Sequence, residues 1–204
     1  MTPVDHAGEA RHSFLAYVRS DLKRYAAAEK REITASFVLR MIFLVPGFQF
    51  VFARRIQDML YGVPLFGRPL GRIWWWWTCR SFGSELAIAA RVGKGLYIPH
   101  PVGMVIGLCR IGDNVTIQQN VTIGQVGLGI PGDPQIGDGA YLGAGAVILG
   151  DLEIGSGAII GANSVVRKDV PAGARAVGAP ARVLEAAVTP EPAILTDNPS
   201  RKGE

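Results

Sequence analysis

The sequence has few residues of the kinds that bind metals or cross-link chains. Its 204 residues include three histidines and two cysteines, Cys79 and Cys109, which show neither metal-ligand spacing nor a disulfide framework. A zinc site with three histidine ligands would need more histidines than the repeat region offers, so we expect no bound metal. The low cysteine content makes a reducing cytoplasm the default compartment.

Charge and long apolar runs are also scarce. Charged residues make up 19% of the sequence, which argues against a nucleic-acid binder, and the N-terminus lacks a secretory signal pattern. The most apolar stretch, residues 37–53, is interrupted by Arg40 and by Pro46–Gly47, so it makes a poor membrane-spanning helix. Residues 1–85 hold 12 basic and 7 acidic side chains, whereas residues 86–204 hold 9 and 10. This asymmetry predicts two parts with different roles.

Glycine, by contrast, is abundant and periodic. Of 26 glycines, 19 fall between Leu86 and Arg182, where the sequence repeats every six residues. Each hexad opens with a branched aliphatic residue, and the heads are Val92, Ile111, Ile117, Ile136, Leu142, Ile148, Ile154, Ile160 and Val166. A period of six fits neither a helix nor simple strand alternation, so it indicates an internal repeat. It predicts a triangular coil whose aliphatic heads stack inward, with a glycine-rich β-sandwich as the alternative.

The predicted fold class is therefore mainly β, a parallel β-helix of hexapeptide repeats preceded by an α-helical region. Because β-helices with this hexapeptide signature are known to be left-handed, we expect a left-handed parallel β-helix. The handedness is an exception to the usual right-handed crossover. We place the helical region at residues 1–84, the β-helix at 85–184 and a flexible, Pro-rich tail at 185–204. Within the first part, helical spacing covers residues 12–31, 37–61 with a break at Pro46–Gly47, and 70–82.

One histidine interrupts the repeat. His100 lies between Pro99 and Pro101, which stiffen the backbone around it, and a rigid corner is a suitable place for a general base. The alternative is a corner histidine bonded to backbone. His6 and His12 lie near the N-terminus, where we expect no catalytic role.

A second break separates Ile123 from Ile136. The inserted residues 124–135 are too many for a corner, so they must leave the coil as a loop, where substrate contacts often collect. Asp133 is the one ionisable group in this loop. It is either a substrate contact or a solvated turn residue.

Three stretches carry a family resemblance. They are VGKGLYIPHPVGMVIG at 92–107, IGDNVTIQQNVTIG at 111–124, and the run from Ile136 that closes with GAPARV at 178–183. Together with VPGFQFVFARRI at 45–56, they resemble the serine acetyltransferase family of left-handed β-helix acyltransferases, over roughly residues 36–184. The resemblance implies an acetyl-CoA-dependent O-acetyltransferase that forms a homotrimer or a dimer of trimers, with sites between neighbouring β-helices.

The resemblance also assigns roles in catalysis. It makes His100 the catalytic base and places an orienting acid fifteen residues earlier, at Glu85. The imidazole would remove the proton of the acceptor hydroxyl while Glu85 fixes its tautomer. Backbone N–H groups at Gly124 and Gln125 are expected to stabilise the developing oxyanion.

Acetyl-CoA would be held along the coil surface. Ala144 and Ala162 match the family's small residues beside the pantetheine arm. Arg167 and Lys168 are candidates for the phosphates, with a solvated corner as the alternative.

The acceptor is predicted from the positions at which this sequence differs from the serine-binding residues of the family. The family's Arg-His pair, which contacts the serine carboxylate, aligns with Gly132 and Asp133, and Pro99 replaces an Asp that helps to bind serine. Another serine-contacting Asp corresponds to Glu32. Burying the charged carboxylate and ammonium groups of serine without charge partners costs binding free energy.

We therefore expect the acceptor to be a sugar hydroxyl in exopolysaccharide or capsule biosynthesis, lying near Gln125, Gly132 and Asp133. The alternatives are an L-serine O-acetyltransferase of cysteine biosynthesis and a non-catalytic β-helix assembly module.

Four consecutive tryptophans, Trp74–Trp77, stand among Arg68, Arg72 and Arg80. They predict either a core or subunit-interface cluster, or a peripheral contact with the inner face of the plasma membrane.

Overall fold

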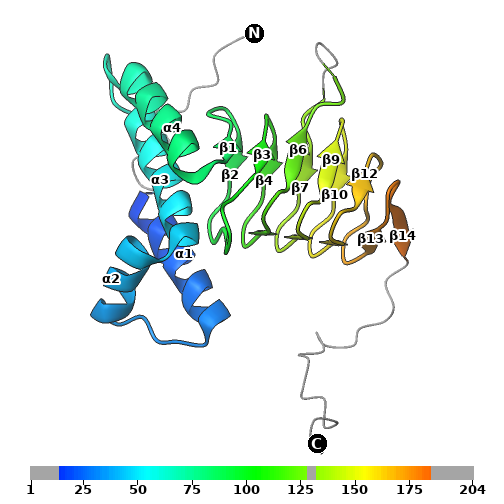
Figure 1. Ribbon diagram of the computed structural model, residues 1–204, viewed down its shortest axis with the longest axis horizontal. Helices are drawn as coiled ribbons and strands as arrows, with labels where there is room; N and C mark the ends of the chain where they lie inside the picture. The colour runs from blue at the N-terminus through cyan, green and yellow to red at the C-terminus, as the bar shows by residue number, and fades with distance from the viewer. Residues whose placement is uncertain (1–13, 128–131, 185–204) are drawn as a thin grey trace, which may run out of the picture.

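The computed structural model describes residues 14–127 and 132–184. Four helices come first (Figure 1): α1 Phe14–Glu29, α2 Ala35–Leu44, α3 Pro46–Tyr61 and α4 Gly67–Phe82. Thr34 caps α2 by accepting a hydrogen bond from the Phe37 N–H at 3.2 Å. Pro46 begins α3, where a missing N–H does no harm. The helices confirm the predicted helical region, including its break at Pro46–Gly47.

Within the described residues, fourteen short strands follow and form three sheets. The first sheet contains β1 (Glu85–Leu86), β3 (Val105–Ile106), β6 (Thr122–Gly124), β9 (Val147–Leu149) and β12 (Val165–Val166). The second contains β2 (Arg91–Val92), β4 (Arg110–Ile111), β7 (Gln135–Ile136) and β10 (Glu153–Ile154). The third contains β5 (Thr116–Ile117), β8 (Tyr141–Leu142), β11 (Ile159–Ile160), β13 (Arg175–Val177) and β14 (Arg182–Leu184). All strand pairs are parallel except β13 with β14. In the middle coils, neighbouring strands of a sheet, such as β6 and β9, are three strands apart along the chain, so each of these coils contributes one strand to each sheet.

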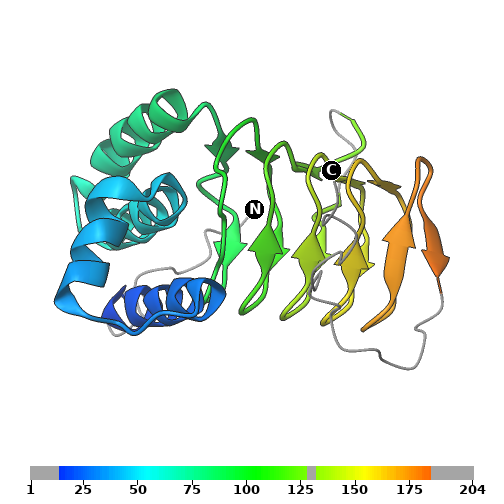
Figure 2. The ribbon, with the colours of Figure 1, turned by 60° about the horizontal axis from the view of Figure 1, so that its bottom comes forward.

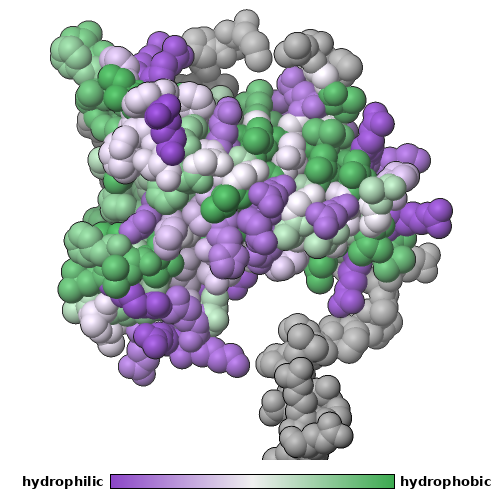
Figure 3. Space-filling model, viewed as in Figure 1, coloured by the Kyte–Doolittle hydropathy of each residue, from purple (hydrophilic) through white to green (hydrophobic). Residues whose placement is uncertain are grey.

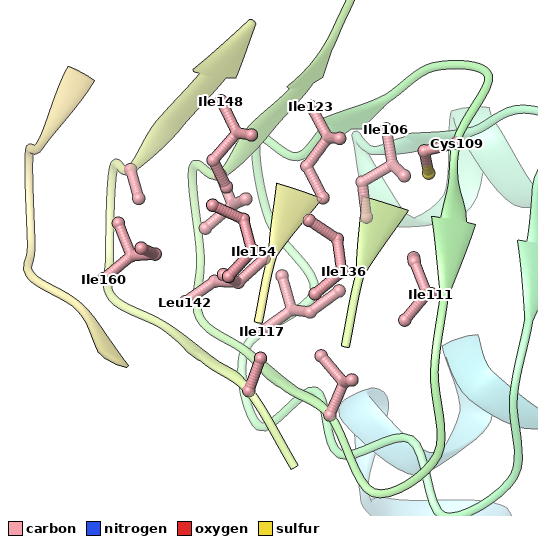
Figure 4. Close-up of a cluster of buried hydrophobic side chains, with 14 of the residues drawn as sticks. Ile106, Cys109, Ile111, Ile117, Ile123, Ile136, Leu142, Ile148, Ile154 and Ile160 are labelled. Carbon is pink, nitrogen blue, oxygen red and sulfur yellow. The ribbon is translucent and has the colours of Figure 1, made fainter. Parts of the chain in front are cut away.

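The hexad heads form the core of the coil. Ile117, Leu142 and Ile160, stacked in the third sheet, are 0% exposed. Figure 4 shows the aliphatic side chains from all three sheets pointing into one shared interior. At the corners, Asn120 and Asn163 adopt positive φ values of 58° and 55°, which asparagine tolerates better than most residues. The predicted left-handed parallel β-helix is confirmed.

The helical region closes one end of this β-helix (Figures 1 and 2). Arg55 forms a buried ion pair with Asp21, at 2.9 Å. Arg54 and Arg55 also donate hydrogen bonds to carbonyl groups of the first coil, those of Ala87, Ala90, Val92 and Gly93. Phe50 and Val51 of α3 belong to the same apolar cluster as the coil interior. The first coil therefore has its backbone acceptors and its apolar end covered by helices.

No single helix among the described residues is long and apolar enough to cross a membrane, although α2 and α3 together, bent by 86°, meet that length and composition. The tail predicted at 185–204 and the histidines at 6 and 12 lie outside the described residues.

Candidate functional site

The three corners of the coil form three edges that run along the β-helix. One edge joins the third sheet to the first and consists of residues 99–104, 118–121, 143–146 and 161–164; we call it the histidine edge. A second joins the first sheet to the second, through residues 107–109, 150–152, 167–169 and the loop after β6; we call it the loop edge. The sequence-predicted site residues divide between these two edges.

His100 lies exposed on the histidine edge, in a corner longer than those of the following coils. The backbone before it is held by the helical region. Tyr25 of α1 donates a hydrogen bond to the Ile98 carbonyl at 2.8 Å and accepts one from the Ile98 N–H at 3.2 Å. Gly47 of α3 lies so close to the carbonyls of Ile98 and Pro99 that a Cβ atom would collide with them. Burial raises the pKa of Tyr25 well above its usual range, so this hydroxyl stays protonated.

The backbone after His100 is held by Ser84. Its hydroxyl donates to the Pro101 carbonyl at 3.1 Å and accepts from the Met104 N–H at 3.0 Å. Sequence reasoning missed both Ser84 and Tyr25 as supports of this corner, because their partners are 17 and 73 residues away along the chain. The adjacency of Ser84 to Glu85 is the only signal that the sequence offered.

Glu85 opens β1, next to this support. It pairs in register with Val105, and its carboxylate is exposed. Within residues 14–127 and 132–184, no hydrogen bond joins the Glu85 carboxylate to the His100 imidazole. The structure thus places both groups at one corner without the contact that the resemblance implies.

Small residues continue the histidine edge beyond His100. Ala144 and Ala162 stand in successive coils, since the Asn163 N–H donates to the Ala144 carbonyl at 2.8 Å. Gly143 stacks on the backbone of the next coil so closely that a Cβ atom there would meet the Ala162 nitrogen at 2.6 Å. This stretch of the edge therefore has no large side chain to block a thin, extended molecule.

The remaining predicted site residues lie on the loop edge. Gly124 ends β6, where a Cβ atom would meet no atom within 4 Å, and its carbonyl accepts from the Gly150 N–H at 3.0 Å. The first sheet separates the loop edge from His100, so within one chain the predicted site residues of the loop edge do not lie beside His100. The residues concerned are Gly124, Gln125, Gly132, Asp133, Arg167 and Lys168.

The tryptophan run divides into two halves. Trp74 and Trp75 are half-buried and donate hydrogen bonds to the carbonyls of Ala53 and Leu86. Trp76 and Trp77 are 56% and 49% exposed, and Figure 3 shows apolar side chains gathered over the helical end of the molecule. Half of the run is thus packed on the protein. The subunit contact and the bilayer contact for the exposed rings both stay predictions.

A pocket of about 270 Å³ lies where α1 turns into α2. Its walls combine two guanidinium groups, one carboxylate, two hydroxyls and one aromatic ring: Arg31, Arg40, Glu32, Thr34, Ser36 and Phe37. This pocket has charges of both signs, which the loop edge at Gly132 and Asp133 does not provide.

Comparisons with known proteins agree on one family. Residues 133–168 match the family model described as bacterial transferase hexapeptide (six repeats). A probable serine acetyltransferase 5 from Oryza sativa subsp. japonica is 40% identical over 86% of this chain and 51% of its own length. The crystal structure of a Neisseria gonorrhoeae serine acetyltransferase has a TM-score of 0.75 and 36% identity, covering 88% of this chain and 69% of that one. A serine acetyltransferase solved in complex with CoA has a TM-score of 0.73 and 29% identity, covering 88% and 73%.

These relatives correct the predicted acceptor. The chain spans about half the length of that rice relative, yet the relatives and solved structures are named serine acetyltransferases. The expectation of a sugar hydroxyl in exopolysaccharide or capsule biosynthesis was therefore wrong. It rested on the differences at Gly132, Asp133 and Pro99 and gave less weight to Glu32, which lines one pocket together with Arg31 and Arg40.

Proposed function

Because the chain belongs to the serine acetyltransferase-like family of hexapeptide-repeat acyltransferases, we propose that it is an acetyl-CoA-dependent L-serine O-acetyltransferase. The observation that carries this proposal is the His100 corner, an exposed imidazole on a rigid support at the head of an edge of small residues. A non-catalytic assembly module would not need such a corner.

His100 acts as the general base. With its backbone fixed on both sides, the imidazole is positioned to take the proton from the serine hydroxyl as that oxygen attacks the acetyl carbonyl. General-base catalysis contributes about 10²–10⁴ in rate. Glu85, at the same corner, accepts a hydrogen bond from the other ring nitrogen once the substrate orders the side chains, and so fixes the tautomer.

Acetyl-CoA supplies the acetyl group as a thioester. The stretch around Ala144 and Ala162 suits its pantetheine arm, because residues 143–146 and 161–164 carry only small side chains. Arg167 and Lys168 are exposed cations suited to phosphates, but they lie on the loop edge. A groove between two chains would use the histidine edge of one and the loop edge of the other.

The outer faces of the coil support a homotrimer. Outward residues of the first and third sheets, which flank His100, include the apolar side chains Val105, Tyr141 and Ile159, which are 50%, 39% and 36% exposed, together with the charged Glu85 and Arg175. Outward residues of the second sheet include Arg110 and Glu153. We propose that the apolar faces meet in a trimer, where the Gly124 and Gln125 backbone of one chain approaches His100 of its neighbour and stabilises the developing oxyanion.

Acetyl transfer to defined acceptors tests this function. The purified protein is incubated with acetyl-CoA and L-serine, a neutral sugar, or no acceptor, and both thioester loss and the acetylated product are followed. We expect serine-dependent thioester loss and O-acetylserine as the product. Thioester loss with the sugar but not with serine would refute the proposal.

A further inference from the structure

The pocket at the α1–α2 turn carries an unusual set of charges for its size. A volume of about 270 Å³ is below the range of pockets for drug-sized ligands, so it suits a small metabolite. Arg31 and Arg40 bring two positive charges, and Glu32 brings one negative charge, to the same walls. A ligand that complements both signs has a carboxylate and an ammonium group.

Arg40 is held in place by neighbouring side chains, and one of its N–H donors makes no hydrogen bond with the described residues. Its Nη2 atom pairs with the Glu29 carboxylate, and its guanidinium lies over the Phe37 ring at 5.8 Å. Its Nε atom is buried and has no hydrogen-bond partner within residues 14–127 and 132–184. A fixed guanidinium with an unused donor is suited to a carboxylate, which accepts charge-assisted hydrogen bonds.

The hydroxyls on the walls are not equally available. Thr34 uses its oxygen to accept from the Phe37 N–H, and its hydroxyl and that of Ser36 lie 2.9 Å apart. The polar contacts that a ligand could gain therefore come chiefly from Arg31, Arg40 and Glu32.

The pocket is linked to the His100 corner through two side chains. Glu29, the partner of Arg40, stands near enough to Tyr97 for its charge to help raise the pKa of that phenol, after burial. Tyr97 lies three residues before His100, and its ring packs against Tyr25 with centroids 4.7 Å apart. The pocket is thus built on the same helical support that fixes the general base.

We infer that Arg31 and Arg40 bind the carboxylate of the amino-acid acceptor, in place of the positive charges absent at Gly132 and Asp133. Glu32, which the family resemblance already matches to a serine-contacting Asp, faces the ammonium group from the same pocket. This inference rests on the proposed function. It explains which side chains contact the carboxylate and the ammonium group of serine, given that Gly132 and Asp133 provide no positive charge.

The test compares serine with serinamide, which keeps the hydroxyl and the amine but lacks the carboxylate. Arg31→Gln is the primary variant, since Arg31 is exposed and its loss leaves the Arg40–Glu29 pair intact. Arg40→Gln is the second variant. Arg19→Gln, an exposed arginine of α1 that does not line the pocket, is the matched control. KM and kcat are measured for each acceptor and for acetyl-CoA, and calorimetry measures serine binding without acetyl-CoA.

We expect Arg31→Gln and Arg40→Gln to raise the serine KM and dissociation constant about ten-fold, as for loss of a charged hydrogen bond. The kcat for serine, the serinamide KM and the acetyl-CoA KM should stay within two-fold of the Arg19→Gln values, because lost uniform binding changes KM alone. Equal effects on serine and serinamide, or no effect on serine, would overturn the inference. Serine binding that requires Arg31, without any acetyl transfer, would instead refute the proposed function alone.

Discussion

Replacing Tyr25 with Phe removes a single oxygen atom from the support of the His100 corner. That oxygen donates a hydrogen bond to the Ile98 carbonyl at 2.8 Å and accepts one from the Ile98 N–H at 3.2 Å. The Ile98 side chain is 0% exposed, so both backbone groups lie in the protein interior. A buried polar group left without a partner costs about 1–3 kcal/mol. We expect a total loss of about 2 kcal/mol in the free energy of unfolding, because the 3.2 Å bond is the weaker of the two. For a chain of this size, that loss lowers Tm by about 4–8 °C.

The same variant should slow catalysis. Ile98 is two residues from His100, and a small displacement of a catalytic group can reduce the rate about 10²-fold. We expect kcat to fall about ten-fold or more, while the KM for acetyl-CoA stays within two-fold. Tyr97→Phe is the matched control, since the Tyr97 hydroxyl makes no hydrogen bond within the described part of the chain. Scanning calorimetry gives Tm and thioester loss gives kcat. If Tyr25→Phe and Tyr97→Phe have the same Tm and kcat, the Tyr25 hydroxyl does not hold the His100 corner in place.

Three further predictions test other parts of the structure. Arg55→Met leaves Asp21 buried without its partner and should lower the free energy of unfolding by about 3–5 kcal/mol in a urea titration; an unchanged midpoint would contradict this. Ala144→Leu should raise the KM for acetyl-CoA about ten-fold, whereas Ala172→Leu, at the corner between the second and third sheets, should not; equal effects would remove the histidine edge as the pantetheine site. Burial raises the pKa of Cys109 from 9.0 to about 12, so its contribution to stability is full below pH 9 and is lost as pH rises towards 12. A buried, protonated thiol reacts slowly, so at pH 8 a disulfide reagent should label Cys109 only after unfolding; fast labelling of Cys109 in the native protein would contradict its burial.

The period of six was sufficient to predict the β-helix, because each hexad repeats one local arrangement of an inward aliphatic residue and a tight corner. Ile117, Leu142 and Ile160 are identifiable from spacing alone. The helix break was also predictable, since Pro46 cannot continue a preceding helix.

The parts of the site that depend on contacts distant in sequence were not predictable. Tyr25 and Ile98 are 73 residues apart, and no local pattern links them. The pocket that joins Arg31 and Arg40 exists only because the chain turns between α1 and α2. The wrong sugar assignment followed from this limit, since the loop residues could be compared position by position, whereas the grouping of Arg31, Glu32 and Arg40 in one pocket could not be predicted from the sequence.

The central claim is that His100 removes the proton of a serine hydroxyl during acetyl transfer. The most direct measurement is kcat for L-serine with saturating acetyl-CoA, compared between the wild-type protein and His100→Gln, with Tm recorded for both. We predict a fall in kcat of about 10²–10⁴ at an unchanged Tm. A His100→Gln protein that acetylates serine at the wild-type rate would contradict it.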